Sequence, residues 1–178
     1  MRSSLTSFMT RLVFCSLFSM ATCLSGCADP LNAEILELQQ RFMINVPPQG
    51  EVSISSVRAD LESGELAADS EVVIRARISA GDVPPWAEGQ AQFIVTDATG
   101  HDGDEDHDPH ECPFCKRNIM DSMAQVRLSG KDGKTIAIDT RKLLGVKDHS
   151  LLVIRARVIP ENSEMLSLDA RQICVVSR

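Results

Sequence analysis

Apolar and polar positions alternate along most of the chain after residue 70. The alternation occurs in six short, β-branched segments that turn residues separate: 70–79, 89–97, 124–130, 134–139, 150–159 and 165–176. A period of two is typical of half-buried strands. One helical segment, 139–146, interrupts them, with Asp139 or Thr140 as its cap and Gly145 as its stop. The pattern predicts a mainly β domain with one short helix before its last two strands.

One pentapeptide, Val-Ile-Arg-Ala-Arg, occurs at 73–77 and again at 153–157. Because side chains alternate across a strand, Ile74 and Ile154 are expected to face inward while the arginines of both copies face outward. Nothing around the two copies is duplicated, so they are not units of a repeat array. We interpret them as the first and fourth strands of one barrel, and their arginines as a solvated face rather than an anion site.

The order of these elements resembles the OB-fold, a small Greek-key barrel with its helix between the third and fourth strands. The resemblance covers about residues 51–176, in which 52–78 look like the first strand and 151–176 like the last two. It implies an OB-fold-like Greek-key barrel of five to six strands with one short helix before the last two strands. The hairpin signal Lys131–Lys134 fits this fold, since Asp132-Gly133 suits a tight turn.

A short amphipathic helix is predicted before the barrel, over residues 29–42. Asp29 is its expected N-cap and Pro30 its first helical residue. Two prolines and a glycine at 47–50 then end it. We expect residues 27–50 to be a lipid-proximal helix and linker, either a stalk or packed on the domain. Residues 51–178 form the OB-like β-barrel domain, with an acidic His/Cys insertion at 99–122.

The N-terminus has the pattern of an export signal. Arg2 and Arg11 precede an uncharged apolar run that is too short for a stable spanning helix. Leu24-Ser25-Gly26-Cys27 resembles the lipobox of bacterial lipoproteins, in which the cysteine is lipidated and becomes the mature N-terminus. The resemblance implies a signal peptide at 1–26 and a lipid on Cys27; the alternative is an ordinary secretory signal. It places the protein in the cell envelope, anchored by lipid to the exported face of a membrane.

Charge limits the classes of partner. Cleavage would remove Arg2 and Arg11 from the 18 basic residues and none of the 25 acidic ones, so the formal charge would fall from −7 to −9. An acidic chain with one Trp and no Tyr is not expected to bind nucleic acid. Membrane attachment would come from acyl chains rather than from charge.

The insertion holds the strongest candidate chemistry. His107, His110, Cys112 and Cys115 form the pattern H-x-x-H-x-C-x-x-C, a full tetrahedral set of nitrogen and sulfur ligands. The Cys-Pro-Phe-Cys segment also resembles a zinc-knuckle turn. The pattern favours a transition-metal site, with zinc as the expected ion. Copper stays open, because the methionines at 120 and 123 follow and soft sulfur ligands favour Cu(I).

Two other interpretations of the insertion stay open. Cys112 and Cys115 resemble the dithiol of glutaredoxin-like proteins, and a helix after them would stabilise the Cys112 thiolate. However, no βαβ pattern surrounds them, and the preceding acids disfavour a thiolate. They could instead form a structural disulfide in an envelope protein-interaction module that uses loops near Trp86. No catalytic motif stands out, which favours a non-enzymatic role. Cys174 is expected to be a buried free thiol.

A narrower resemblance combines several of these features. The lipobox, the OB-like strands, the segment Pro84–Asp97 and Cys-Pro-Phe-Cys-Lys together are similar to a group of uncharacterised lipoproteins predicted in planctomycete genomes. The group has no established activity to carry over. The sequence therefore predicts a membrane-anchored, metal-binding OB-like lipoprotein with a possible envelope partner.

Overall fold

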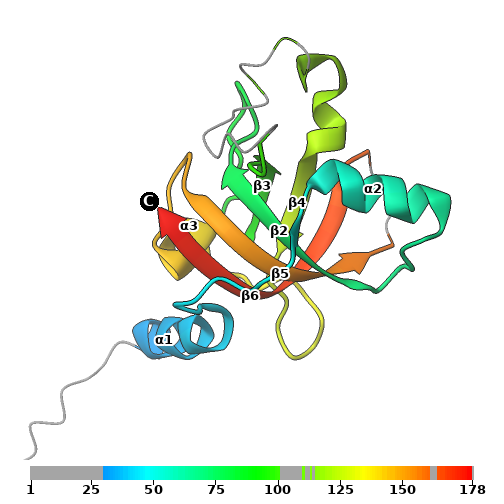
Figure 1. Ribbon diagram of the computed structural model, residues 1–178. Helices are drawn as coiled ribbons and strands as arrows, with labels where there is room; N and C mark the ends of the chain where they lie inside the picture. Colours follow the sequence, from blue (N-terminus) through cyan, green and yellow to red (C-terminus); the bar gives the residue numbers. More distant parts are fainter. Residues whose placement is uncertain (1–29, 101–109, 111–112, 114, 161–163, 178) are drawn as a thin grey trace, which may run out of the picture.

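The computed structural model describes residues 30–100, 110, 113, 115–160 and 164–177. The predicted signal peptide and Cys27 lie outside these residues. The helices and strands, in chain order, are α1 (Pro30–Phe42), β1 (Glu51–Val52), α2 (Ile54–Ser63), β2 (Glu71–Ile78), β3 (Gln92–Asp97), η1 (Cys115–Ser122), β4 (Met123–Arg127), α3 (Thr140–Leu144), β5 (Leu151–Ile159) and β6 (Leu166–Ser177). The fold is mainly β, as the alternation predicts (Figure 1).

Five strands close into a barrel, and the short strand β1 pairs with β2 outside this closed set. The sheet order is β1-β2-β3-β4-β6-β5, and β2 also pairs with β5. All pairs within the barrel are antiparallel except β4 with β6. The helix α3 lies between the third and fourth barrel strands along the chain. This is the strand order of the OB-fold, so the topology confirms the predicted Greek-key barrel.

The two copies of the pentapeptide are neighbours in the barrel. Ile74 of β2 is the direct partner of Ile154 in β5, and both side chains are fully buried. The predicted inward direction of the isoleucines is confirmed. Arg75 and Arg155 lie on the outer face, where their side chains are 18% and 37% exposed and approach carboxylates at 3.7 and 3.3 Å. Ion pairs therefore cover part of the arginine face.

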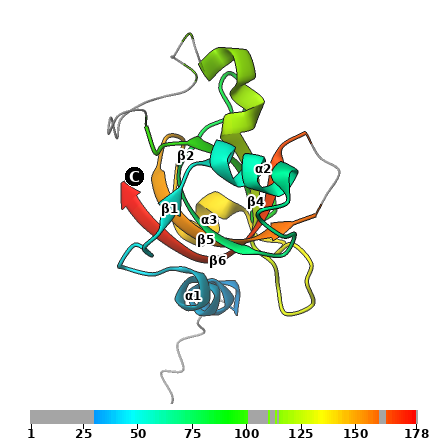
Figure 2. The ribbon, with the colours of Figure 1, turned by 45° about the vertical axis from the view of Figure 1, so that its right-hand side comes forward.

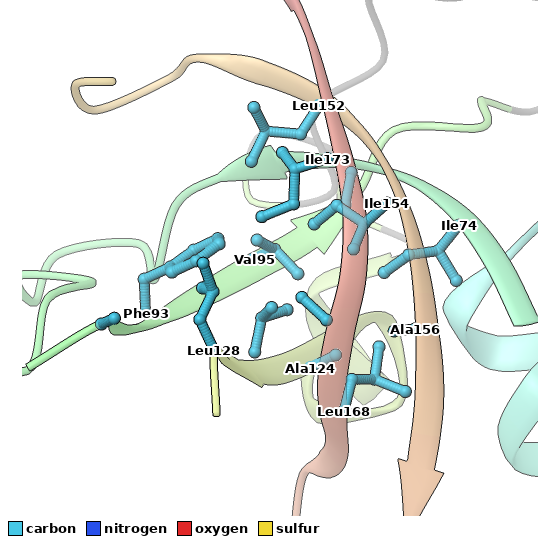
Figure 3. Packing of buried hydrophobic residues seen from close by; sticks show 14 of the residues in the cluster. Ile74, Phe93, Val95, Ala124, Leu128, Leu152, Ile154, Ala156, Leu168 and Ile173 are labelled. Atoms are coloured by element: carbon cyan, nitrogen blue, oxygen red, sulfur yellow. The ribbon is translucent and has the colours of Figure 1, made fainter. Parts of the chain in front are cut away.

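The barrel interior is a single apolar core. Figure 3 shows aliphatic side chains from opposite strands meeting inside it, with Phe93 at one end. Ile136 and Ile138, two residues apart, are both buried against this core. They belong to segment 134–139, which was predicted as a strand but makes only an isolated bridge between Thr135 and Ser129. Ile136 still exchanges backbone hydrogen bonds with Leu128 and Ala91, but the chain turns into α3 at Asp139, so no further pairing follows.

The helix α1 packs on the barrel. Its Ile35 and Phe42 are buried, and Gln39 Nε2 donates to the Leu143 carbonyl of α3 at 2.9 Å. Figures 1 and 2 both show α1 below the barrel, on the side away from η1. Of the two placements left open by the sequence, the structure shows the packed one. None of the helices within the described residues is long and apolar enough to cross a membrane.

The helix α2 was not predicted. It replaces the extended segment expected before the first barrel strand. Ser53 Oγ accepts from Ser56 N at 3.0 Å at its start, and Gly64 ends it in the left-handed region, at φ 80°. Both are normal cap residues for an α-helix. Figure 2 shows α2 across the opening of the barrel near β4.

Candidate metal centre

The insertion leaves the barrel from the end of β3, and Asp97 fixes this point. Asp97 Oδ1 accepts from Thr99 N at 2.8 Å and from Thr99 Oγ1 at 2.6 Å. Its other oxygen, Oδ2, accepts from Ile54 N at 2.6 Å, at the start of α2. The carboxyl group is nearly buried, so these bonds replace its contacts with water. One side chain thus joins the start of the insertion to α2.

His110 returns from the insertion to the barrel wall. Its Nε2 lies 3.0 Å from Oγ1 of Thr96, which is 1% exposed on β3. The Thr96 hydroxyl donates its only hydrogen to the Ser79 carbonyl at 2.9 Å. Nε2 of His110 must therefore be the donor in its bond to Thr96, since the hydroxyl has no second hydrogen. In the neutral ring, this places the lone pair on Nδ1.

Gly81 shapes the surface on which His110 lies. It follows β2 and has φ +68°, in the region that favours glycine. A Cβ at this position would lie 3.0 Å from Nδ1 and 3.1 Å from Cε1 of His110. A side chain here would therefore strain the backbone and displace the imidazole. The position of His110 depends on Gly81 as well as on Thr96.

The far end of the insertion is η1, which α2 holds through Arg58. Its guanidinium donates to the Glu164 carbonyl at 2.7 Å and to the Met120 carbonyl at 3.4 Å, and lies 3.6 Å from the Asp121 carboxylate. The helix expected after Cys112 is a short 3-10 helix that begins at Cys115 and is kinked at Asn118. Its N-terminus is therefore at the second cysteine rather than the first, which lessens its support for a Cys112 thiolate.

The four predicted ligands are only partly within the described residues. The side chain of His110 is described, and Cys115 is placed by its backbone at the start of η1. His107 and Cys112 lie outside. Among the residues that the structure describes, no three His, Cys, Asp or Glu side chains are grouped as metal ligands. What the structure adds is the attachment of His110 to the barrel.

Sequence reasoning missed the residues that position His110. Thr96 and Gly81 are 14 and 29 residues away along the chain, and neither belongs to the His/Cys motif. Only the pairing of β2 with β3 brings them together. The one available signal was Thr96 itself, a polar residue directly after the apolar run Phe93–Val95.

Residues away from the insertion have structural roles. Trp86 packs on Phe93 with ring centroids 6.4 Å apart, as a turn anchor would. Cys174 is a buried free thiol, as predicted. At the start of α3, hydrogen bonds from the Arg141 side chain lower the pKa of Asp139 to about 2, and Asp139 raises the pKa of Arg141. This pair is exposed and supports the cap of the helix.

Comparisons with known proteins do not indicate a function for the chain. No protein-family model matches it, and no curated protein sequence matches it. Among solved structures it is similar to a protein from Leishmania major Friedlin described provisionally as an aspartyl-tRNA synthetase, at 15% identity and a TM-score of 0.44. The match covers 85% of this chain and 26% of that one, so the chain spans about a quarter of its length. At this level the similarity carries no argument, and the fold rests on strand order.

Proposed function

We propose that the protein is a membrane-anchored, non-enzymatic lipoprotein that binds a transition metal ion, with zinc as the expected ion, in the insertion between β3 and β4. The ligands would be His107, His110, Cys112 and Cys115. The observation that carries the proposal is the bond from Nε2 of His110 to Thr96. Histidines that bind metals usually donate their other ring N–H to a fixed acceptor, which sets the tautomer and the ring orientation.

The donor set fits zinc chemically. Two imidazoles and two thiolates are a common tetrahedral set for structural zinc. The thiolates must be deprotonated to bind, so affinity should fall as the pH falls. The acids of the insertion add a negative potential that attracts a cation. Because Thr96 and Asp97 hold the insertion on an already closed barrel, the metal is expected to leave without unfolding the domain.

The proposed anchor would place the proposed metal site away from the bilayer. Two residues separate Cys27 from Pro30, the first residue of α1. Such a tether spans about 10 Å. Since α1 packs on the barrel, the lipid would hold the α1 side against the membrane. The helix η1 lies on the opposite side of the barrel (Figures 1 and 2), so the insertion would face an envelope partner or the surrounding solution.

The test is the metal content of the reduced full-length protein in detergent. We expect about one zinc per wild-type chain, lost in Cys112→Ser with Cys115→Ser and in His107→Ala with His110→Ala, while β-sheet content persists. Matched controls are Cys174→Ala and His149→Asn, which change a cysteine and a histidine outside the insertion. Asn suits position 149 because its φ is +63°.

Three results would contradict the proposal. If only the cysteine variant loses metal, the histidines are not ligands and the tetrahedral set is wrong. If the controls lose metal equally, the site lies elsewhere. If reduced wild type binds none, the cysteines act as a redox dithiol or a structural disulfide, and the reduction potential of the pair decides between these two.

A further inference from the structure

A groove with methionines in its walls lies beside His110. It has a volume of about 480 Å³ and is bounded by η1, by the loop after β2 and by the outer faces of β3 and β4. We call it the methionine groove, and its sulfur-bearing walls are Met120, Met123 and Met165. Figure 1 shows η1 standing above the start of β4.

Strand register explains why residues so far apart in sequence share one groove. Met123 is the partner of Thr96 on β3. Ala124, the residue after Met123, pairs in parallel with Leu166 of β6. Met123 and Met165 therefore lie side by side on two neighbouring segments of the chain, about 4.8 Å apart. Both precede a buried, inward-facing residue and therefore face outward, although Met123 is covered there and only 6% exposed. A row of side chains thus runs across the outer face of the barrel, from His110 through Thr96 and Met123 to Met165.

Met120 adds a third thioether from above this row. It lies near the end of η1, three residues before Met123 begins β4, and both side chains line the groove. Arg58 holds this end of η1 by donating to the Met120 carbonyl. The Met120 side chain remains 37% exposed, so it does not simply fill a gap in the core. Three methionines from η1, β4 and the start of β6 therefore border one open space.

The chemistry of this space suits a soft cation. Thioethers are neutral, polarizable ligands that select Cu(I) over hard ions such as Mg²⁺ and Ca²⁺, which require oxygen ligands. Among the described residues that border the groove, Asp82 is the only carboxylate. Lys116, which is exposed, also borders the groove, so its charge and that of Asp82 offset each other. The other walls are mainly apolar, and a monovalent ion of low hydration is the cation least penalised by such surroundings.

We propose that the methionine groove binds a soft monovalent cation, with Cu(I) as the expected ion, through the sulfurs of Met120, Met123 and Met165. This site goes beyond the proposed function, because its ligands are different residues and none of them belongs to the cysteine motif. It provides a second, thiol-independent metal site on the same end of the barrel.

The test uses Ag(I) as a diamagnetic substitute for Cu(I). The full-length protein in detergent, carrying Cys112→Ser, Cys115→Ser and Cys174→Ala so that these thiols do not compete for Ag(I), is labelled with ¹³C at the methionine methyl groups. Ag(I) should shift the resonances of Met120, Met123 and Met165 together and saturate them at one equivalent. The resonance of Met43, which packs against the core by α1, is the internal control and should not move with them.

Variants confirm the assignment. Met120→Leu with Met165→Leu should weaken Ag(I) and Cu(I) binding at least tenfold, while Met43→Leu should leave it unchanged. Leu conserves volume, so the fold is expected to persist, and circular dichroism checks this. Absent shifts, an equal response of Met43, or unchanged affinity in the double variant would overturn the proposal. Zinc content of the chain with both cysteines intact is measured separately, so either metal site can fail without the other.

Discussion

Replacing Thr96 by Val should both destabilise the barrel and release His110. Val has nearly the same shape but no hydroxyl, so it removes the donor to the Ser79 carbonyl and the acceptor of His110 Nε2. A buried acceptor left without its donor costs about 1 to 3 kcal/mol. We therefore expect Thr96→Val to lower the free energy of unfolding by that amount in urea titrations of the metal-free protein. The zinc affinity of the proposed site should also fall by about 10- to 100-fold, because the hydroxyl that fixes the His110 ring is lost.

Thr140→Val is the matched control for this change. Thr140 is equally buried, and its hydroxyl also donates to a backbone carbonyl, that of Gln90, at 3.3 Å. In Thr140→Val, the Gln90 carbonyl still accepts from the backbone N of residue 140, at 3.2 Å in the wild type. Thr140→Val should therefore lower the free energy of unfolding by less than Thr96→Val does. It should not change zinc affinity. Equal costs for the two variants, or a ¹⁵N spectrum showing that neutral His110 carries its proton on Nδ1, would refute the reasoning.

Three further predictions concern the fold, the pH response and the anchor. Ile154→Ala, which removes a fully buried side chain opposite Ile74, should cost about 2 to 4 kcal/mol in urea unfolding; wild-type stability would contradict the core packing. Asp139 has a folded pKa lowered to about 2, so its ion pair with Arg141 stabilises the fold above pH 4 and stops doing so as the pH falls through 2. The stability difference between wild type and Asp139→Asn should therefore shrink over that range, and a constant difference would argue against the pair. Cys27→Ser should release a folded protein from the detergent phase; a variant that still partitions there would show that the lipid is not the anchor.

The fold could be predicted because its strongest signals are local. Alternation, turn residues and the cap at Asp139 each depend on a few neighbouring residues. The helix α2 was missed because the segment Val52–Ser56 alternates like a strand, while its helical spacing appears only when Ile54, Val57 and Leu61 are considered together. Short apolar patterns of this kind do not distinguish the two structures. Its caps at Ser53 and Gly64 were the deciding signals, and both were present in the sequence.

The candidate site, too, has features that local sequence predicts and features that only the fold supplies. Imidazoles and thiols within nine residues identify possible ligands without any knowledge of the fold. The methionine groove could not be predicted in full, because Met165 joins it through the parallel pairing of β4 with β6. Met120 and Met123 alone, at helical spacing, are as consistent with a core face as with a ligand set. Only the register between distant strands shows which residues share the groove; composition and spacing along the sequence do not.

Strand register also indicates how the proposed metal site could lie in the insertion without weakening the barrel. Thr96 and Asp97 are consecutive in β3, so their side chains point to opposite faces of the strand. Thr96 holds His110 on the outer face, and Asp97 holds Thr99 and the start of α2 at the barrel end. The insertion is thus fixed at two points that belong to an already paired strand. Replacing a proposed metal-binding side chain in the insertion should therefore change the free energy of the insertion alone. The pairing of β3 with β2 and β4 should persist.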